Sequence, residues 1–172
     1  VDGARLLNAT IASGVSAERW SANADTVWID FSKGLGAPMG ACLASTEQVI
    51  DHAWLWKHRL GGAMRQSGLM AAAAIYALEH HVERLGDDHT RATCLATALS
   101  EMGATVVDPE TNMVFFDPRP CGVEGEETVA RLAELEVRVG LIGDRVRAVT
   151  HLDVDDAGID LAISACAEVL NP

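Results

Sequence analysis

The sequence predicts an α/β fold in two parts, a layer of strands and helices followed by a small α+β domain. Residues 26–31, TVWIDF, are β-branched and aromatic with few polar breaks, as in a strand covered on both faces. An alanine-rich stretch over 64–85 predicts a long helix. After Gly103, short strand-like segments alternate with amphipathic helices. We therefore expect one domain at 1–103 and a second at 104–172.

The elements of the first part follow from apolar periodicity and from glycine. Helices are expected where apolar residues recur every three or four positions, and strands where β-branched residues cluster. The helix at 64–85 should bury one apolar stripe and end at Gly86. In order, we expect a helix at 6–12, strands at 26–31 and 41–44, a helix at 47–59 capped by Thr46, and the helix at 64–85 with the stripe Ile75, Leu78, Val82 and Leu85.

The second part begins after a further helix that ends at Gly103. Asp155 is a good N-cap residue for the last helix, because its side chain can accept a backbone N–H. The expected elements are a helix at 88–102, strands at 105–107 and 113–116, a helix at 126–136, strands at 137–142 and 146–152, and a last helix with the apolar face Ile159, Ile163, Cys166 and Leu170.

Composition excludes several classes of protein. The 172 residues are 49% hydrophobic, so a packed core is feasible, and the formal net charge of −12 repels phosphate backbones and anionic lipid heads. We therefore expect neither nucleic acid nor a membrane as a partner. The four cysteines are scattered without CxxC spacing, and His80-His81 lacks a third ligand, so we expect no metal, reduced thiols, a cytoplasmic location and two histidines on a helix surface.

Lys33 is one of only two lysines and opens the glycine-rich loop SKGLGAPMG at 32–40. Partial burial with little negative charge nearby would lower the pKa of its ammonium group and free the amine to attack a carbonyl. The glycines of the loop would let the backbone approach a planar or phosphorylated ligand. A solvated lysine in a turn is the commoner alternative. A dinucleotide site is not indicated, because Pro38 and the missing third glycine spoil that motif.

Four strings in the right order resemble the threonine aldolase family. They are VDGAR at 1–5, DFSKGLGAPMG at 30–40, LGGAMRQSG at 60–68 and RAVTHLDV at 147–154, and the resemblance covers essentially the whole chain. These are pyridoxal-phosphate enzymes of the aspartate-aminotransferase fold, type I. The resemblance implies the end of the large cofactor-binding domain, with a mostly parallel sheet, followed by the small C-terminal domain.

The resemblance also assigns residues to the cofactor. Lys33 matches the lysine that forms the Schiff base, and Asp2 matches the acid that keeps the pyridine nitrogen protonated. Arg65, in the GGAMRQ string, is expected to reach the phosphate group, in its own or a neighbouring subunit's site, and Ser32 could donate to the same phosphate. Without the resemblance, Asp2 reads as a cap of the following helix and Ser32 as a residue that stabilises the turn.

The substrate would be held by Arg5 and Arg147, whose planar guanidinium groups bond both oxygens of a carboxylate. Each arginine could instead form an ordinary surface ion pair. The implied reaction cleaves a β-hydroxy-α-amino acid of the threonine or allo-threonine class to glycine and an aldehyde. Two alternatives remain: a β-eliminating lyase of the same fold, and a non-catalytic homologue that only associates with other subunits.

Members of the resembled family carry another stretch of similar length before the DGAR string. The resemblance therefore implies that these 172 residues are the C-terminal half of such an enzyme and a poor catalyst alone. It also implies a missing N-terminal half as partner and, in the whole enzyme, a homotetramer.

Overall fold

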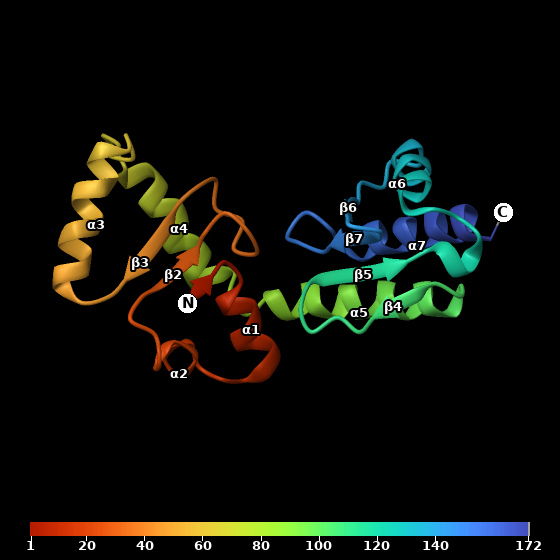
Figure 1. Cartoon of the computed structure of the whole chain (residues 1–172), viewed down its shortest axis with the longest axis horizontal. Coiled ribbons are helices and arrows are strands. Elements are labelled where there is room, and N and C mark those ends of the chain that lie inside the picture. Colours follow the sequence, from red (N-terminus) through yellow and green to blue (C-terminus); the bar gives the residue numbers. More distant parts are fainter. Residues whose placement is uncertain (172) are drawn as a thin grey trace. The chain divides into compact units, whose positions relative to one another are not determined.

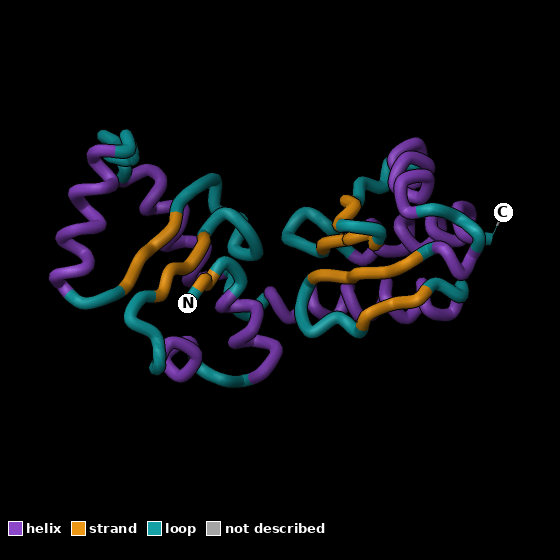
Figure 2. The backbone as a smooth tube through the Cα atoms, viewed as in Figure 1, coloured by secondary structure: helices purple, strands orange, loops and turns teal. Residues whose placement is uncertain are grey.

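The computed structural model describes residues 1–171 and divides into two compact units, Val1–Leu85 and Gly86–Pro172 (Figures 1 and 2). The sequence placed the boundary after Gly103. The difference arises at helix α5 (Leu85–Glu101), which supplies the buried residues Leu95 and Leu99 to the core of the second unit. This helix therefore belongs with the strands that follow it.

The first unit contains a three-stranded mixed sheet in the order β1-β2-β3 (Figure 2). The first two strands are parallel and the last two antiparallel. Gly3 lies opposite Ile29, and a Cβ at Gly3 would overlap the Trp28 carbonyl oxygen, so only glycine fits there. The elements are β1 (Asp2–Gly3), α1 (Leu6–Ser13), α2 (Ala17–Ser21), β2 (Val27–Asp30), β3 (Ala41–Ala44), α3 (Glu47–Arg59) and α4 (Gly68–His80).

The side chains of β2 and α4, in the first unit, are less buried than the sequence indicated. Strand β2 is half-buried along its length rather than covered on both faces. The predicted helix at 64–85 is α4, which ends at His80, and Gly86 falls inside the first turn of α5. The predicted stripe is wrong at two positions, because Ile75 and Leu78 are 55% and 39% exposed, whereas Val82 is half-buried and Leu85 is buried. The buried residues of α4 are Ala74 and Ala77. Small side chains let α4 pack closely under the loop at 32–40, in a cluster of Leu35, Ala37 and Ala77 with Leu7, Phe31 and Val82.

The second unit is an antiparallel sheet in the order β4-β5-β7-β6, with helices against one face. Val114 and Phe116 of β5 lie opposite Ala148 and Val146 of β7, and all four are buried against α5, α6 and α7. The other elements are β4 (Thr105–Val107), β5 (Met113–Asp117), a 3-10 turn (Arg119–Cys121), α6 (Gly125–Glu134), β6 (Gly140–Ile142), β7 (Arg145–Val149) and α7 (Asp156–Leu170). Within residues 1–171, every helix is too short or too polar to cross a bilayer.

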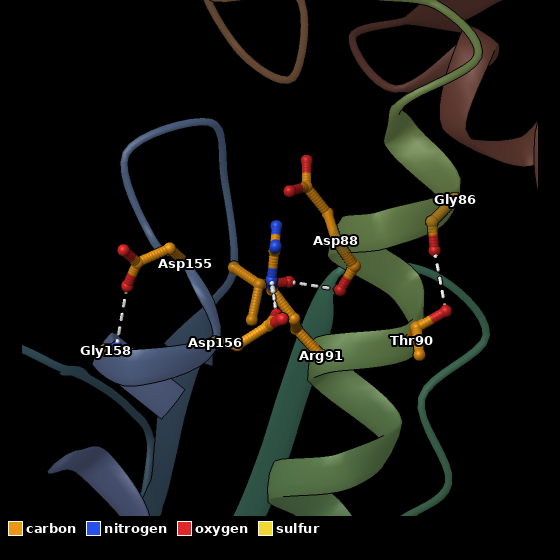
Figure 3. A network of polar contacts seen from close by, with 8 residues as sticks. Gly86, Asp88, Thr90, Arg91, Asp155, Asp156 and Gly158 are labelled. Atoms are coloured by element: carbon orange, nitrogen blue, oxygen red, sulfur yellow. Dashed lines mark hydrogen bonds and ion pairs between the residues drawn. The ribbon is translucent and has the colours of Figure 1, made fainter. Parts of the chain in front are cut away.

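Polar contacts join the start of α5 to the start of α7 within this second unit (Figure 3). Thr150, one residue beyond β7, donates its hydroxyl to the carbonyl oxygen of Asp88 at 2.6 Å. Arg91 Nε lies 2.7 Å from Asp156 Oδ1. Asp155 caps α7 as predicted, because its Oδ1 accepts the Gly158 N–H at 2.8 Å. These contacts fix the end of strand β7.

Candidate active site

Lys33 lies just beyond β2, and its amine faces a carboxylate and an indole. Lys33 Nζ is 3.1 Å from Asp30 Oδ2 and 5.5 Å from the centre of the Trp28 ring. The Lys33 side chain is 38% exposed and that of Asp30 is 13% exposed. The predicted lack of negative charge is therefore wrong, because the turn after β2 brings residues 30 and 33 together. The lysine head group is thus held by an ion pair and by a cation–π contact.

Asp30 is held ionised by the same turn. Burial acts to raise its pKa, but hydrogen bonds from Ser32 and Lys33 outweigh burial and lower the pKa below its usual value. Ser32 donates both its N–H, at 2.7 Å, and its hydroxyl, at 2.6 Å, to Asp30 Oδ1. The single hydroxyl proton of Ser32 is thus engaged within the turn, as the alternative reading of that serine expected.

The glycines of the loop serve its own conformation and packing. Gly36 and Gly40 have φ angles of 69° and 119°, which favour glycine. A Cβ at Gly34 would lie 2.8 Å from Leu85 Cδ2 and 3.0 Å from Asn8 Oδ1. The space beside Gly34 is therefore filled by the chain itself. The approach of a ligand to the glycines of this loop stays a prediction.

Asp2 lies in β1, directly opposite Trp28 of β2, two residues before the carboxyl end of that strand. The Trp28 ring is also the one that lies 5.5 Å from Lys33 Nζ. Asp2 Oδ1 accepts the Ala4 N–H at 3.1 Å, while the N-cap of α1 is Arg5. Asp2 is exposed and does not cap α1, so its carboxylate is accessible.

Arg5 and Arg65 also belong to the first unit. Arg5 is half-buried, and its carbonyl oxygen accepts the Ala9 N–H at the start of α1. Arg65 is exposed in the turn that joins α3 to α4. Its neighbour Gln66 has a φ of 53°, a left-handed conformation that costs a non-glycine residue about 1 kcal/mol. A strained position of this kind is common where a loop serves a ligand.

Arg147 belongs to the second unit. It alternates with the buried Val146 and Ala148, so it lies on the face of the sheet that the helices leave open, opposite Phe115. Its Nε is buried, and within residues 1–171 it has no hydrogen-bond partner. A buried guanidinium N–H without an acceptor suits an anionic ligand. The prediction that Arg147 and Arg5 act together stays a prediction.

Two residues beside Lys33 escaped the sequence analysis, namely Asp30 and Trp28. The spacing of three residues between Asp30 and Lys33 across a turn was the available signal. His81 was placed on a helix surface, which is wrong: it is half-buried, and its Nδ1 lies 2.6 Å from the Leu35 carbonyl oxygen. Among the residues described, His, Cys, Asp and Glu form no group of three or more that could hold a metal ion.

The sequence of this chain is similar to those of known threonine aldolases. The chain is 44% identical to the low specificity L-threonine aldolase of Escherichia coli (strain K12) over 157 residues, which are 90% of this chain and 45% of the relative. It is 34% identical to low-specificity L-threonine aldolase 1 of Arabidopsis thaliana over 99% of this chain and 49% of that one. The chain thus spans about half the length of the curated relatives it matches.

Solved structures give the same outline of the fold. The threonine aldolase of Leishmania major superposes with a TM-score of 0.74 at 16% identity, covering 98% of this chain and 51% of that one. This likeness shows that the chain has the fold of type I pyridoxal-phosphate enzymes over the part it covers. The model of a protein family described as beta-eliminating lyase matches residues 1–119, more than half of the sequence, and the chain therefore belongs to the beta-eliminating lyase family.

Proposed function

We propose that this chain supplies the lysine-bearing part of a pyridoxal-phosphate site that cleaves a β-hydroxy-α-amino acid to glycine and an aldehyde. The observation that carries the proposal is the Lys33 amine, held by Asp30 and Trp28 at the end of β2. Support comes from the 44% identity to the E. coli threonine aldolase across this segment. Because the chain spans about half of that relative, the proposal concerns a site that the whole protein completes.

The residues present fit the cofactor. Lys33 offers a partly exposed primary amine, and Asp2, on the neighbouring strand opposite Trp28, offers an exposed carboxylate for a protonated ring nitrogen. Arg65 is an exposed cation suited to the phosphate, and Ser32 would have to release Asp30 before donating to it. When bound, pyridoxal phosphate supplies an electron sink for the cleaved bond.

The chain's own groups position the Lys33 amine and orient the substrate. Asp30 Oδ2, at 3.1 Å from Lys33 Nζ, accepts a hydrogen bond from the lysine head group and holds it at the end of β2. We assign the substrate carboxylate to Arg147, on the strength of its buried Nε, which has no hydrogen-bond partner among residues 1–171; the role of Arg5 stays a prediction. Fixing the carboxylate orients the bond to be cleaved.

Complementation tests this proposal. The chain is co-expressed with the segment of the E. coli relative that precedes the matched region, and visible absorbance of bound cofactor is measured together with glycine and aldehyde release from threonine. Lys33→Ala is expected to abolish both signals, whereas Lys57→Ala, which removes the only other lysine, leaves both unchanged. Cofactor absorbance that survives in Lys33→Ala contradicts the assignment of the lysine.

A second candidate, β-elimination, is favoured by the description of the matching family. It releases ammonia and a keto acid instead of glycine and an aldehyde, so product analysis of the same complex separates the two reactions. If the unaltered chain shows neither cofactor absorbance nor product, the non-catalytic alternative is favoured.

In the active complex, Arg147→Ala should raise KM for the amino acid and leave cofactor absorbance intact. The homotetramer stays a prediction.

A further inference from the structure

The loop at 32–40 is held from beneath by the end of α4. Leu35 is 2% exposed and packs with Ala37 and Ala77, while Gly34 lies close to Asn8 and Leu85. Three backbone hydrogen bonds shape the loop: Gly36 N–H to Lys33 O, Ala37 N–H to Phe31 O, and Phe31 N–H to Gly40 O. These bonds use the carbonyls of Lys33, Phe31 and Gly40, and none of them uses the carbonyl of Leu35.

The carbonyl of Leu35 is instead bonded to a side chain 46 residues further along the sequence. His81 Nδ1 lies 2.6 Å from Leu35 O. A carbonyl oxygen only accepts, so Nδ1 of His81 carries the proton, in the neutral ring or in the imidazolium. The Tyr76 ring meets the His81 ring edge-on, with centroids 5.5 Å apart. The imidazole is thus held in place by a ring contact and by its hydrogen bond.

This bond reaches Lys33 through a single peptide unit. The oxygen of the Leu35–Gly36 peptide accepts from His81, and the N–H of the same peptide donates to Lys33 O at 2.8 Å. A peptide bonded at both ends cannot rotate without breaking one of the two bonds, and the two bonds polarise each other. His81 therefore fixes the backbone from which the Lys33 side chain projects.

We propose that His81 is a positioning residue for Lys33, acting through the Leu35–Gly36 peptide. The proposal rests on the proposed function for its catalytic meaning, because it concerns the amine assigned to the cofactor. The anchoring itself is a property of this chain and can be measured without cofactor.

The chain offers matched variants for the test. In His81→Asn the amide nitrogen can take the place of Nδ1, and in His81→Gln an amide of the same chemistry sits one methylene further out. His81→Leu removes the donor. His80→Leu is the control, since His80 is exposed on the same helix end and also contacts Tyr76, at 4.3 Å between ring centroids.

Two readouts are taken on the full chain. Amide hydrogen exchange at Gly36 reports the bond to Lys33 O, and acylation by limiting acetic anhydride reports the Lys33 amine, with Lys57 as the internal reference. In His81→Leu, Gly36 exchange should rise about five- to tenfold and the Lys33 to Lys57 acylation ratio about twofold, because the loop is released. His81→Asn should restore both values, and His80→Leu should change neither.

Distinct results separate the possible failures. Unchanged Gly36 exchange in His81→Leu overturns the proposal, and so does an Asn variant that behaves no better than Gln. Should the Leu variant fail to fold, the Asn and Gln pair decides alone. The unaltered chain, complemented with the N-terminal segment, tests the proposed function separately. If its Lys33 binds no pyridoxal phosphate while Gly36 amide exchange still depends on His81, the proposed function fails and the positioning role of His81 stands.

Discussion

The two units of this chain differ in how many apolar side chains they bury. The second unit closes a core around Phe116, Val146 and Leu99, with helices against one face of its sheet. Among the described residues, the first unit buries fewer apolar side chains, namely a cluster of Leu35, Ala37 and Ala77 and, outside it, Leu6, Ala74 and Leu85. Its exposed large apolar side chains include Leu43, Trp54, Leu55, Trp56, Leu60, Met64, Leu69, Ile75 and Tyr76. The proposed chemistry therefore lies mainly in the unit whose own residues stabilise it less.

The largest effect expected from this contrast is in the second core. Phe116→Ala should lower the free energy of unfolding of the second unit by about 3–5 kcal/mol, because a fully buried ring is lost and a cavity remains. Trp56→Ala, in the first unit, removes an exposed ring and should change stability by no more than about 0.5 kcal/mol. Denaturant-dependent amide exchange resolves the two units, and a Trp56 variant as costly as the Phe116 variant would remove the contrast.

A smaller effect is expected where the first unit is tightly packed. Gly3→Ala should destabilise that unit by about 1–3 kcal/mol, because its Cβ would overlap the Trp28 carbonyl oxygen and push β1 from β2. Gly68→Ala is the matched control, since nothing lies within 4 Å of its added Cβ and alanine favours the helix. The same exchange measurement applies. Equal stability of the two variants would show that the β1–β2 pairing contributes little.

The smallest effect concerns charge in the second unit. Hydrogen bonds from Arg119 lower the pKa of Asp117 from its usual 3.8 to about 2. Because the folded pKa lies below the unfolded one, this stabilisation is complete above the unfolded value and is lost as the pH falls from about 4 towards 2. Arg119→Gln should return the Asp117 midpoint, followed by NMR, towards 3.8, whereas Arg138→Gln should leave it unchanged. An unchanged midpoint in Arg119→Gln would exclude this ion pair as the cause.

Local patterns predicted most elements, because they act over a few residues. Helix α3 and strands β3 and β4 have the predicted bounds, and Asp155 caps α7. The buried side of α4 was missed, since Ala77 is buried by packing against Leu35 and Ala37 of the loop at 32–40, which are distant in the sequence. The division after Leu85 was also missed, because the sequence of α5 does not show that this helix packs against the strands that follow it.

The candidate site divides in the same way. The register of β1 and β2 puts Asp2 opposite Trp28, whose ring contacts Lys33, and the sequence strings indicated Asp2 and Lys33. Asp30 follows from a spacing of three residues and could have been predicted. The bond from His81 to Leu35 spans 46 positions, and no periodicity links such distant residues. Contacts between residues far apart in the sequence, such as His81 and Leu35, could not be predicted from the sequence.

The placement of Trp28 gives the molecule a built-in optical probe. All four tryptophans, at 20, 28, 54 and 56, lie in the first unit, so indole emission is silent about the second. Of these rings, Trp28 is the one recorded 5.5 Å from the amine of Lys33. A chromophore attached to Lys33 Nζ would quench the fluorescence of Trp28 by energy transfer. Comparison with a Trp28→Phe variant would show how much of the total quenching comes from Trp28.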